Sequence, residues 1–238
     1  MPKQYTQGWV EFYKLRFKVT SDVLIPRPET ELLVDEVLLS LRNHEVAKQS
    51  IILDLGTGSG NIAISIAVNN KDLKIIATDV SPKALEVARQ NAKLHGVEDK
   101  IEFIQSDLLS AFRHPELDSG SISNRFRIKS GMTDNLIIVT NLPYIPTSRI
   151  PHLDPSVKDF EPHLALDGGK DGFELYRKLF KQIKEKGWRP KLILGEIDSA
   201  HGELAILEAQ NYFPDSEVKV KTDLAHKQRI LIIHLLSR

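Results

Sequence analysis

The chain has 238 residues, of which 41% are hydrophobic and 27% are charged, and this composition excludes an intrinsically disordered protein. Its 32 Lys and Arg residues balance 32 Asp and Glu residues, so a protein held on nucleic acid mainly by a long-range positive field is not expected. The chain contains no cysteine, which excludes disulfides, thiolate zinc sites and cysteine nucleophiles.

The first elements predicted along the chain are a short hairpin and a helix. Residues 8–25 alternate loosely between apolar and polar side chains, which predicts a β-hairpin. Pro28 is followed closely by two glutamates, and this pattern opens a helix because carboxylates suit the positive end of the helix dipole. We therefore interpret residues 1–45 as a hairpin and helix that pack on a main domain formed by residues 46–238.

From residue 51 onward, predicted strands and helices alternate. The predicted strands span residues 51–55, 74–78, 101–105, 136–140, 191–196, 216–222 and 228–235. The predicted helices span residues 60–69, a stretch that begins at Ser81, 171–186 and 200–211. This order predicts an α/β fold with a mostly parallel sheet, helices on both faces and an antiparallel edge formed by the two last strands.

Residues 113–135 interrupt the alternation. They are rich in Ser, Gly, Asn, Asp and Arg and have no apolar periodicity. A connection of this length is either a functional loop or a disordered insertion. We favour the disordered insertion.

A glycine-rich turn follows the buried strand at 51–55 and opens the next helix. The dinucleotide fingerprint requires a glycine where Asn61 stands, and a P-loop requires a Lys-Ser/Thr pair that is also missing. The remaining pattern, Asp-x-Gly-x-Gly-x-Gly, is the type that receives the methionine half of S-adenosylmethionine. The alternative is a tight turn without a ligand. The cofactor-binding residues predicted here are Asp54, Gly56, Thr57, Gly58, Ser59 and Gly60.

Two later strand ends carry aspartates that suit a nucleoside. The carboxylate of Asp79 can accept hydrogen bonds from both ribose hydroxyls, an arrangement that serves NAD and S-adenosylmethionine alike. Without this context, Asp79 would be read as a helix cap. Asp107, with Leu108 beside it, follows the third strand, at a position from which it can bind the adenine amino group. The alternative is an ordinary loop aspartate.

The chemistry is predicted at the tetrapeptide that follows the fourth strand, Asn141-Leu142-Pro143-Tyr144. An amide or aromatic amino nitrogen is a poor nucleophile because its lone pair is delocalised. The side-chain oxygen of Asn141 and the main-chain carbonyl of Leu142 can each accept one N–H and so direct the lone pair toward a methyl donor. Tyr144 can pack against the planar group while Pro143 stiffens the turn. The alternative is a turn without function.

With these motifs placed, the chain resembles the HemK (PrmC) family, which methylates the N5 amide nitrogen of the glutamine in the Gly-Gly-Gln motif of peptide-chain release factors. The matching residues are 24–31 (LIPRPETE), 54–60, 79–82 with 84–85, 160–162 with 165–166, 168–169 with 171–172, and 223–225 with Arg229. The resemblance implies a Rossmann-like class I methyltransferase fold with seven strands and S-adenosyl-L-methionine as cofactor. It implies cofactor contacts at Gly56 to Gly60, Asp79, Asp107-Leu108 and Asn141, with the target glutamine held by Asn141 to Tyr144. It also places Glu29 to Glu31 near the cofactor, although these residues can equally be only the helix opening.

The chain departs from the family pattern in three places. The family tetrapeptide is Asn-Pro-Pro-Tyr, whereas Leu142 stands at its second position here, which predicts a looser turn. The chain begins almost at the hairpin, so we expect it to lack the family's N-terminal helical domain. The stretch 113–135 also lengthens one loop. Glu161 is interpreted either as a support for Asn141 or as a surface carboxylate.

The expected partner is a release factor as protein substrate, with no stable nucleic-acid complex and no membrane contact. The eight histidines form no close cluster, so no metal site is expected. No signal peptide or membrane span is predicted, and we expect a cytoplasmic monomer. Two other functions stay open: N-methylation of an exocyclic amino group of a nucleic-acid base, and a non-catalytic S-adenosylmethionine-binding remnant.

Overall fold

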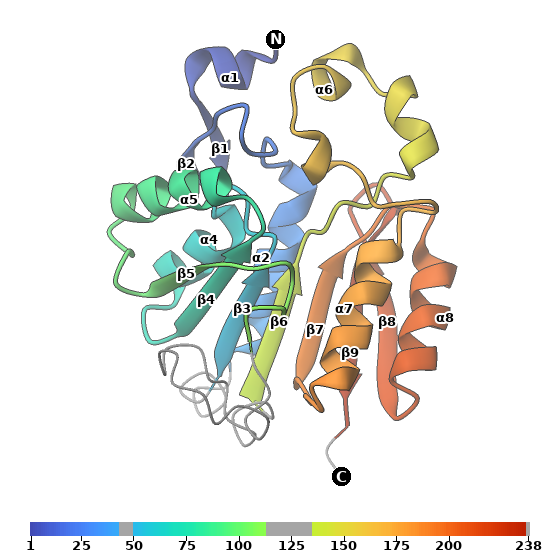
Figure 1. Cartoon of the computed structure of the whole chain (residues 1–238). Coiled ribbons are helices and arrows are strands. Elements are labelled where there is room, and N and C mark those ends of the chain that lie inside the picture. The colour runs from blue at the N-terminus through green and yellow to red at the C-terminus, as the bar shows by residue number, and fades with distance from the viewer. Residues whose placement is uncertain (43–49, 113–134, 237–238) are drawn as a thin grey trace.

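A seven-stranded sheet forms the centre of the computed structural model, which describes residues 1–42, 50–112 and 135–236 (Figure 1). The strand order is β5-β4-β3-β6-β7-β9-β8. The strands are β3 (Ile51–Leu55), β4 (Lys74–Asp79), β5 (Ile101–Gln105), β6 (Leu136–Thr140), β7 (Leu192–Glu196), β8 (Ser216–Thr222) and β9 (Gln228–Leu235). Strands β3 to β7 are parallel, which confirms the predicted α/β fold and its mostly parallel sheet.

The predicted antiparallel edge is also confirmed, and it has a definite order. β9 pairs antiparallel with both β7 and β8, so the last strand of the chain lies inside the sheet and β8 lies at its edge. Ile230, Leu231 and Ile233 of β9 are buried, as an interior strand requires. Lys219 and Lys221 of β8 are exposed, and charged side chains of this kind protect an edge strand from pairing with other chains.

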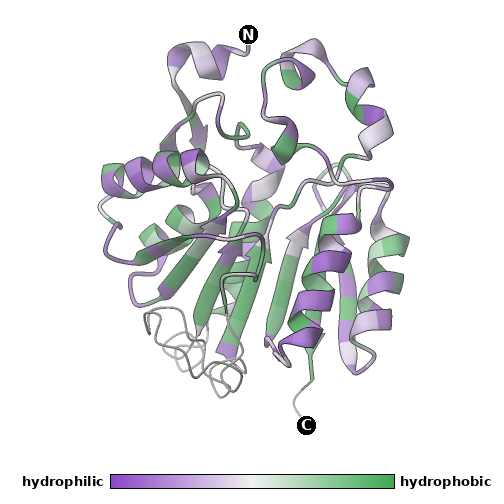
Figure 2. Cartoon of the chain, viewed as in Figure 1, coloured by the Kyte–Doolittle hydropathy of each residue, from purple (hydrophilic) through white to green (hydrophobic). Residues whose placement is uncertain are grey.

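Helices cover both faces of the sheet. α2 (Glu31–Ser40), α4 (Asn61–Asn69) and α5 (Pro82–Leu94) contribute to one side, and α7 (Glu174–Glu185) and α8 (Gly202–Tyr212) to the other. In β6, Leu136 and Ile138 join the cluster under α7, whereas Ile137 and Val139 join the cluster under α2 and α4. Figure 2 shows the sheet largely green and helices α5 and α7 purple on their outer sides, as burial on both faces demands.

The N-terminal residues form α1 (Lys3–Gln7), which was not predicted, and the predicted hairpin, β1 (Trp9–Phe12) with β2 (Leu15–Lys18). The buried side chain of Asn91, on α5, fastens this hairpin to the sheet domain. Asn91 Oδ1 accepts from the Lys18 N–H at 2.7 Å, and its Nδ2 donates to the carbonyls of Lys18 at 3.0 Å and of Ser59 at 2.8 Å. One amide therefore ties the hairpin, a helix and the glycine-rich turn together.

Short helical turns fill a region where no regular element was predicted. They are η4 (Thr147–His152), α6 (Pro155–Lys158) and η5 (His163–Ala165). At the predicted helix opening, η1 (Pro28–Thr30) directly precedes α2. Figure 1 shows α6 and the N-terminal elements at the same end of the sheet, beyond the carboxyl ends of the parallel strands. The helix predicted from residue 171 begins at Glu174, because Gly172 has a φ of 79° and stays in the preceding loop.

Of the predicted insertion at 113–135, residues 113–134 lie outside the described residues. Among the helices that are described, none combines the length and the apolar character needed to cross a membrane.

Candidate functional site

A cavity of about 340 Å³ opens at the carboxyl ends of the parallel strands. β3 and β6 are hydrogen-bonded neighbours with Leu55 opposite Thr140, so Gly56 and Asn141 leave the sheet side by side. Both residues line the cavity. Of the residues predicted from the sequence, those that line it are Gly56, Thr57, Gly58, Ser59, Asp79, Asp107, Leu108, Asn141, Leu142 and Pro143. The two predicted motifs therefore share one site.

The glycine-rich turn has the backbone that its sequence demands. Gly56, Gly58 and Gly60 have φ values of 71°, 54° and 81°, in the left-handed region that side chains disfavour. A side chain added at Gly58 would meet no atom within 4 Å, so this glycine leaves open space beside the cavity. The Gly58 N–H donates to Asp79 Oδ2 at 2.9 Å, which joins the turn to the end of β4.

Asp54 and Gly60 support the turn and are not part of the cavity wall. Asp54 is fully buried, and its Oδ2 accepts from the Thr57 hydroxyl at 2.6 Å and from the Ala63 N–H at 3.3 Å. Burial raises the pKa of Asp54 from 3.8 to about 7, although these hydrogen bonds oppose the rise. A side chain at Gly60 would lie 2.8 Å from Ile64 Cδ1 on α4, so this glycine is required for close packing.

The two predicted nucleoside-binding aspartates differ in their surroundings. Burial raises the pKa of Asp79, while the N–H groups of Ser81 and Gly58 donate to its carboxylate and oppose the rise. Asp107 is half-exposed and forms an ion pair with Lys178 Nζ at 2.5 Å. Lys178, on α7, also lines the cavity and was not predicted, because its partner lies far away in the sequence.

Leu108 has a φ of 52°, which is uncommon for a residue with a side chain. The Ser106 hydroxyl donates to the Leu108 carbonyl at 2.7 Å and helps to hold this conformation. A backbone strained in this way at a cavity wall costs about 1 to 3 kcal/mol and indicates a constrained binding surface.

Residues 22–30 form the opposite wall of the cavity, with Arg27 and Thr30 among the lining residues. Arg27 forms an ion pair with Glu161, whose Oε2 also accepts from the Ile25 N–H at 3.1 Å. Glu161 is only 4% exposed, so it is not a surface carboxylate. Its hydrogen bonds hold the 22–30 segment rather than Asn141, and this departs from both interpretations made from the sequence.

A chain of hydrogen bonds connects the tetrapeptide to two residues that were not predicted as site residues. Asn141 Nδ2 donates to Thr30 Oγ1 at 3.1 Å, and this hydroxyl donates to Glu196 Oε2 at 2.6 Å. The Tyr144 hydroxyl donates to the other oxygen, Glu196 Oε1, at 3.2 Å. Tyr144 is thus turned toward β7 and is not among the residues that line the cavity.

Glu196 ends β7 and is buried. Burial raises the pKa of its carboxyl group, and the hydrogen bonds from Thr30 and Tyr144 and the charge of Arg229 oppose that rise. Burial also raises the pKa of Tyr144, and the neighbouring Glu196 carboxylate adds to the effect. The sequence contained one signal for this residue, a glutamate at the end of an otherwise apolar strand.

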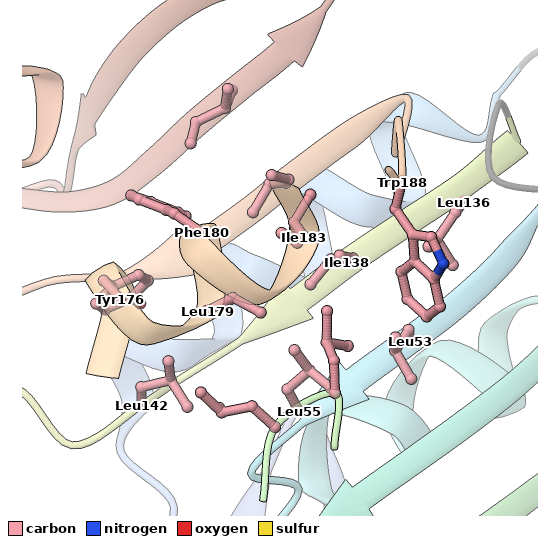
Figure 3. Packing of buried hydrophobic residues seen from close by; sticks show 14 of the residues in the cluster. Leu53, Leu55, Leu136, Ile138, Leu142, Tyr176, Leu179, Phe180, Ile183 and Trp188 are labelled. Atoms are coloured by element: carbon pink, nitrogen blue, oxygen red, sulfur yellow. The ribbon is translucent and has the colours of Figure 1, made fainter. Parts of the chain in front are cut away.

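The side chain of Leu142 anchors the turn in the core. It is 3% exposed and belongs to the apolar cluster under α7. Figure 3 shows it at the edge of that cluster, beside Tyr176, Leu179 and Leu55. The looser turn predicted for leucine at this position is offset by this burial, because a core side chain fixes the backbone that carries it.

The loop at 168–172 packs directly against the backbone of the tetrapeptide. A side chain added at Gly168 would lie 2.7 Å from the Pro143 carbonyl oxygen, and one added at Gly172 would lie 2.2 Å from the Tyr144 carbonyl oxygen. The Gly168 N–H donates to the Ile145 carbonyl at 2.9 Å. Close approach of the two backbones therefore explains why glycine stands at both positions.

Comparisons with known proteins point to one class of enzyme. A family model described as "Methyltransferase domain" matches residues 47–122. The chain is 35% identical over 235 residues to a release factor glutamine methyltransferase of Bacillus cereus, a match that covers 99% of this chain and 77% of the relative. It is 39% identical over 243 residues to the enzyme of the same description from Dictyoglomus turgidum, with 98% and 76% covered.

Solved structures share the fold at low sequence identity. The N-terminal domain of human METTL16, solved in complex with SAH, has a TM-score of 0.61 and 13% identity, with 94% of this chain and 77% of that chain covered. A ribosomal protein L11 methylase from Lactobacillus delbrueckii subsp. bulgaricus has a TM-score of 0.56 and 16% identity, with 92% and 84% covered. These similarities support the Rossmann-like methyltransferase fold.

Proposed function

This chain belongs to the family of release factor glutamine methyltransferases, and we propose that it transfers the methyl group of S-adenosylmethionine to the N5 amide nitrogen of the glutamine in the Gly-Gly-Gln motif of a peptide-chain release factor. One geometric feature carries this proposal. The Gly56 turn and the Asn141 turn leave neighbouring parallel strands and open into one cavity. A cofactor and an amide can therefore meet there.

The cavity has the size and the chemistry that a sulfonium nucleoside requires. Its volume of about 340 Å³ lies within the usual range of ligand pockets. We assign Gly56 to Ser59 to the methionine half of the cofactor and Asp79 to the ribose hydroxyls, with Asp54 and Gly60 supporting the turn. Asp107 and Leu108 are assigned to the adenine. When bound, S-adenosylmethionine supplies an electrophilic methyl group on a sulfonium.

The residues of the tetrapeptide would hold the target nitrogen. We propose that Asn141 Oδ1 and the main-chain carbonyl of Leu142 each accept one N–H of the substrate amide, which directs the nitrogen lone pair and stabilises the positive charge that develops on nitrogen. Pro143 forms part of the cavity wall. Tyr144 is assigned to holding the turn through its hydrogen bond to Glu196. Alignment of the reacting groups accounts for the remaining rate enhancement.

The proposed reaction also suggests the process, the compartment and the assembly state in which the protein acts. We propose that the protein acts in translation termination, in the cytoplasm and as a monomer, without a stable nucleic-acid complex or membrane contact. We also propose that residues 1–45 pack on the methyltransferase domain at 46–238 and complete its cavity, since Arg27 and Thr30 line it.

Mass spectrometry of a release factor co-expressed with this protein tests the proposal. The peptide that carries Gly-Gly-Gln is expected to gain the mass of one methyl group. Asn141→Ala removes the proposed acceptor, and the rate of methylation is expected to fall by about 100- to 1,000-fold, the usual effect of deleting one such hydrogen bond. Asn211→Ala, at an exposed position of α8, is the matched control and is expected to methylate normally.

Parallel assays with tritiated S-adenosylmethionine separate the rival functions. Label found in RNA or DNA alone would overturn the proposal in favour of a nucleic-acid base as substrate. Binding of S-adenosylmethionine in a calorimeter without methyl transfer to any release factor would indicate a non-catalytic protein.

A further inference from the structure

The hydrogen-bond chain from Asn141 to Glu196 has a fixed direction. An ionised Glu196 carboxylate can only accept, so the Thr30 hydroxyl gives its single proton to Glu196 Oε2. Thr30 Oγ1 can then only accept, so the group of Asn141 that faces it must be the amide NH₂. The order of donors and acceptors thus orients an amide whose two ends have nearly the same shape.

We infer that Thr30 and Glu196 are positioning residues that orient the side-chain amide of Asn141, with its NH₂ held by Thr30 and its Oδ1 left to accept the N–H of the substrate. This inference rests on the proposed function for the identity of the substrate. The orientation itself belongs to the protein and exists before any substrate binds.

Orientation matters because the two ends of the amide have opposite effects on the substrate. Asn141 Oδ1 accepts an N–H, whereas a flipped side chain would present NH₂ to the NH₂ of the substrate. The isolated side chain has little preference between the two orientations. The hydrogen bond to Thr30 supplies that preference, so a fraction of the enzyme is not lost to the inactive orientation.

Burial makes the chain difficult to replace by water. Thr30 is 2% exposed and Glu196 is 1% exposed. They come from separate elements, η1 and β7, and the Tyr144 hydroxyl occupies the second oxygen of Glu196. The Tyr176 hydroxyl donates to the main-chain carbonyl of Glu196 at 2.5 Å and holds the end of β7 in place. A water molecule therefore has little room to substitute for the Thr30 hydroxyl.

Two substitutions at Thr30 separate the hydroxyl from the shape of the side chain. Thr30→Val keeps the shape and removes the hydroxyl. We expect kcat for release-factor methylation to fall by at least about twofold from the lost orientation, and by up to about 100-fold where the amide is also displaced. Thr30→Ser keeps the hydroxyl and is expected to recover most of that loss. Thr222→Val, at an exposed position of β8, is the matched control.

A direct measurement reports the orientation without turnover. The side-chain NH₂ of Asn141 gives a pair of resonances in a ¹⁵N–¹H spectrum, identified as the pair that disappears in Asn141→Asp. We expect this pair to shift in Thr30→Val and to stay near its wild-type position in Thr30→Ser. The same spectra report whether each variant is folded.

The outcomes distinguish this inference from the proposed function. A shifted Asn141 pair in Thr30→Val, with a reduced kcat and a nearly unchanged Kd for S-adenosylmethionine, supports the positioning role. An unchanged pair, or equal losses of kcat in Thr30→Val and Thr30→Ser, overturns it. A wild-type protein that methylates no release factor contradicts the proposed function, and the resonance shifts still decide whether Thr30 orients Asn141.

Discussion

Replacing Leu142 by proline would restore the residue that the family tetrapeptide carries, and the structure predicts that this change destabilises the protein. The Leu142 side chain is buried in the cluster under α7, beside Tyr176 and Leu179 (Figure 3). Its main-chain N–H faces the Tyr176 hydroxyl. Proline has a smaller side chain and no N–H, so both interactions are lost together.

The magnitude follows from these two losses and one gain. Leucine-to-alanine changes in cores cost about 2 to 5 kcal/mol, and proline keeps part of the side chain, so about 2 kcal/mol is expected from packing. The lost polar contact between this N–H and Tyr176 adds up to about 1 kcal/mol. Proline restricts the unfolded chain and returns about 0.4 to 1 kcal/mol. The free energy of unfolding should therefore fall by about 2 kcal/mol for Leu142→Pro.

Urea unfolding followed by circular dichroism measures this difference. The midpoint is expected to fall with an unchanged slope, and the melting temperature should fall by about 4 to 8 °C for a chain of this length. Leu142→Met is the control, because it conserves side-chain volume and keeps the N–H, and it should cost less than about 1.5 kcal/mol. A Leu142→Pro variant at least as stable as the wild type would refute the anchoring role given to this side chain.

Two further predictions concern the supports of the turns. In Gly168→Ala, the new Cβ would lie 2.7 Å from the Pro143 carbonyl oxygen and 2.8 Å from Tyr144 Cα. We expect the turn to shift and kcat to fall by about tenfold or more. A wild-type kcat would argue against this contact. Burial raises the pKa of Asp54 to about 7, so the native state binds this proton more tightly than the unfolded state does, and stability falls as the pH rises toward that value. Between about pH 5 and pH 8, the unfolding free energy of Asp54→Asn should decrease by about 2 to 3 kcal/mol less than that of the wild type. Urea titrations at each pH measure this difference, and equal decreases in the two proteins would contradict the prediction.

The strands could be predicted from the sequence because each one has a local signal. The segments 51–55 and 136–140 are mostly apolar and 101–105 is rich in Ile and Phe, and each is a strand with these bounds. The region 141–170 has no such periodicity. Its short helical turns are tied to backbone that no local pattern connects to them, as where the Thr147 N–H donates to the Gly169 carbonyl at 2.9 Å.

The candidate site was predictable where topology alone brings residues together. The ends of neighbouring parallel strands must meet, so the proximity of Gly56 and Asn141 could be derived from the order of the elements. Thr30 and Glu196 are 166 residues apart and meet through one hydrogen bond between side chains. No rule of sequence spacing predicts such a pair. Thr30 also stands where a helix begins, a position at which threonine is common, so the sequence gives no reason to look for a second role.

The tetrapeptide turn owes its rigidity to three separate contacts rather than to its own sequence. Leu142 fixes it to the core from below, the 168–172 loop packs on its backbone, and Thr30 holds the Asn141 amide from the side. A local sequence rule would assign the stiffness of the turn to consecutive prolines. Here packing supplies the same constraint, which explains how leucine can stand in the turn while Asn141 stays directed at the cavity.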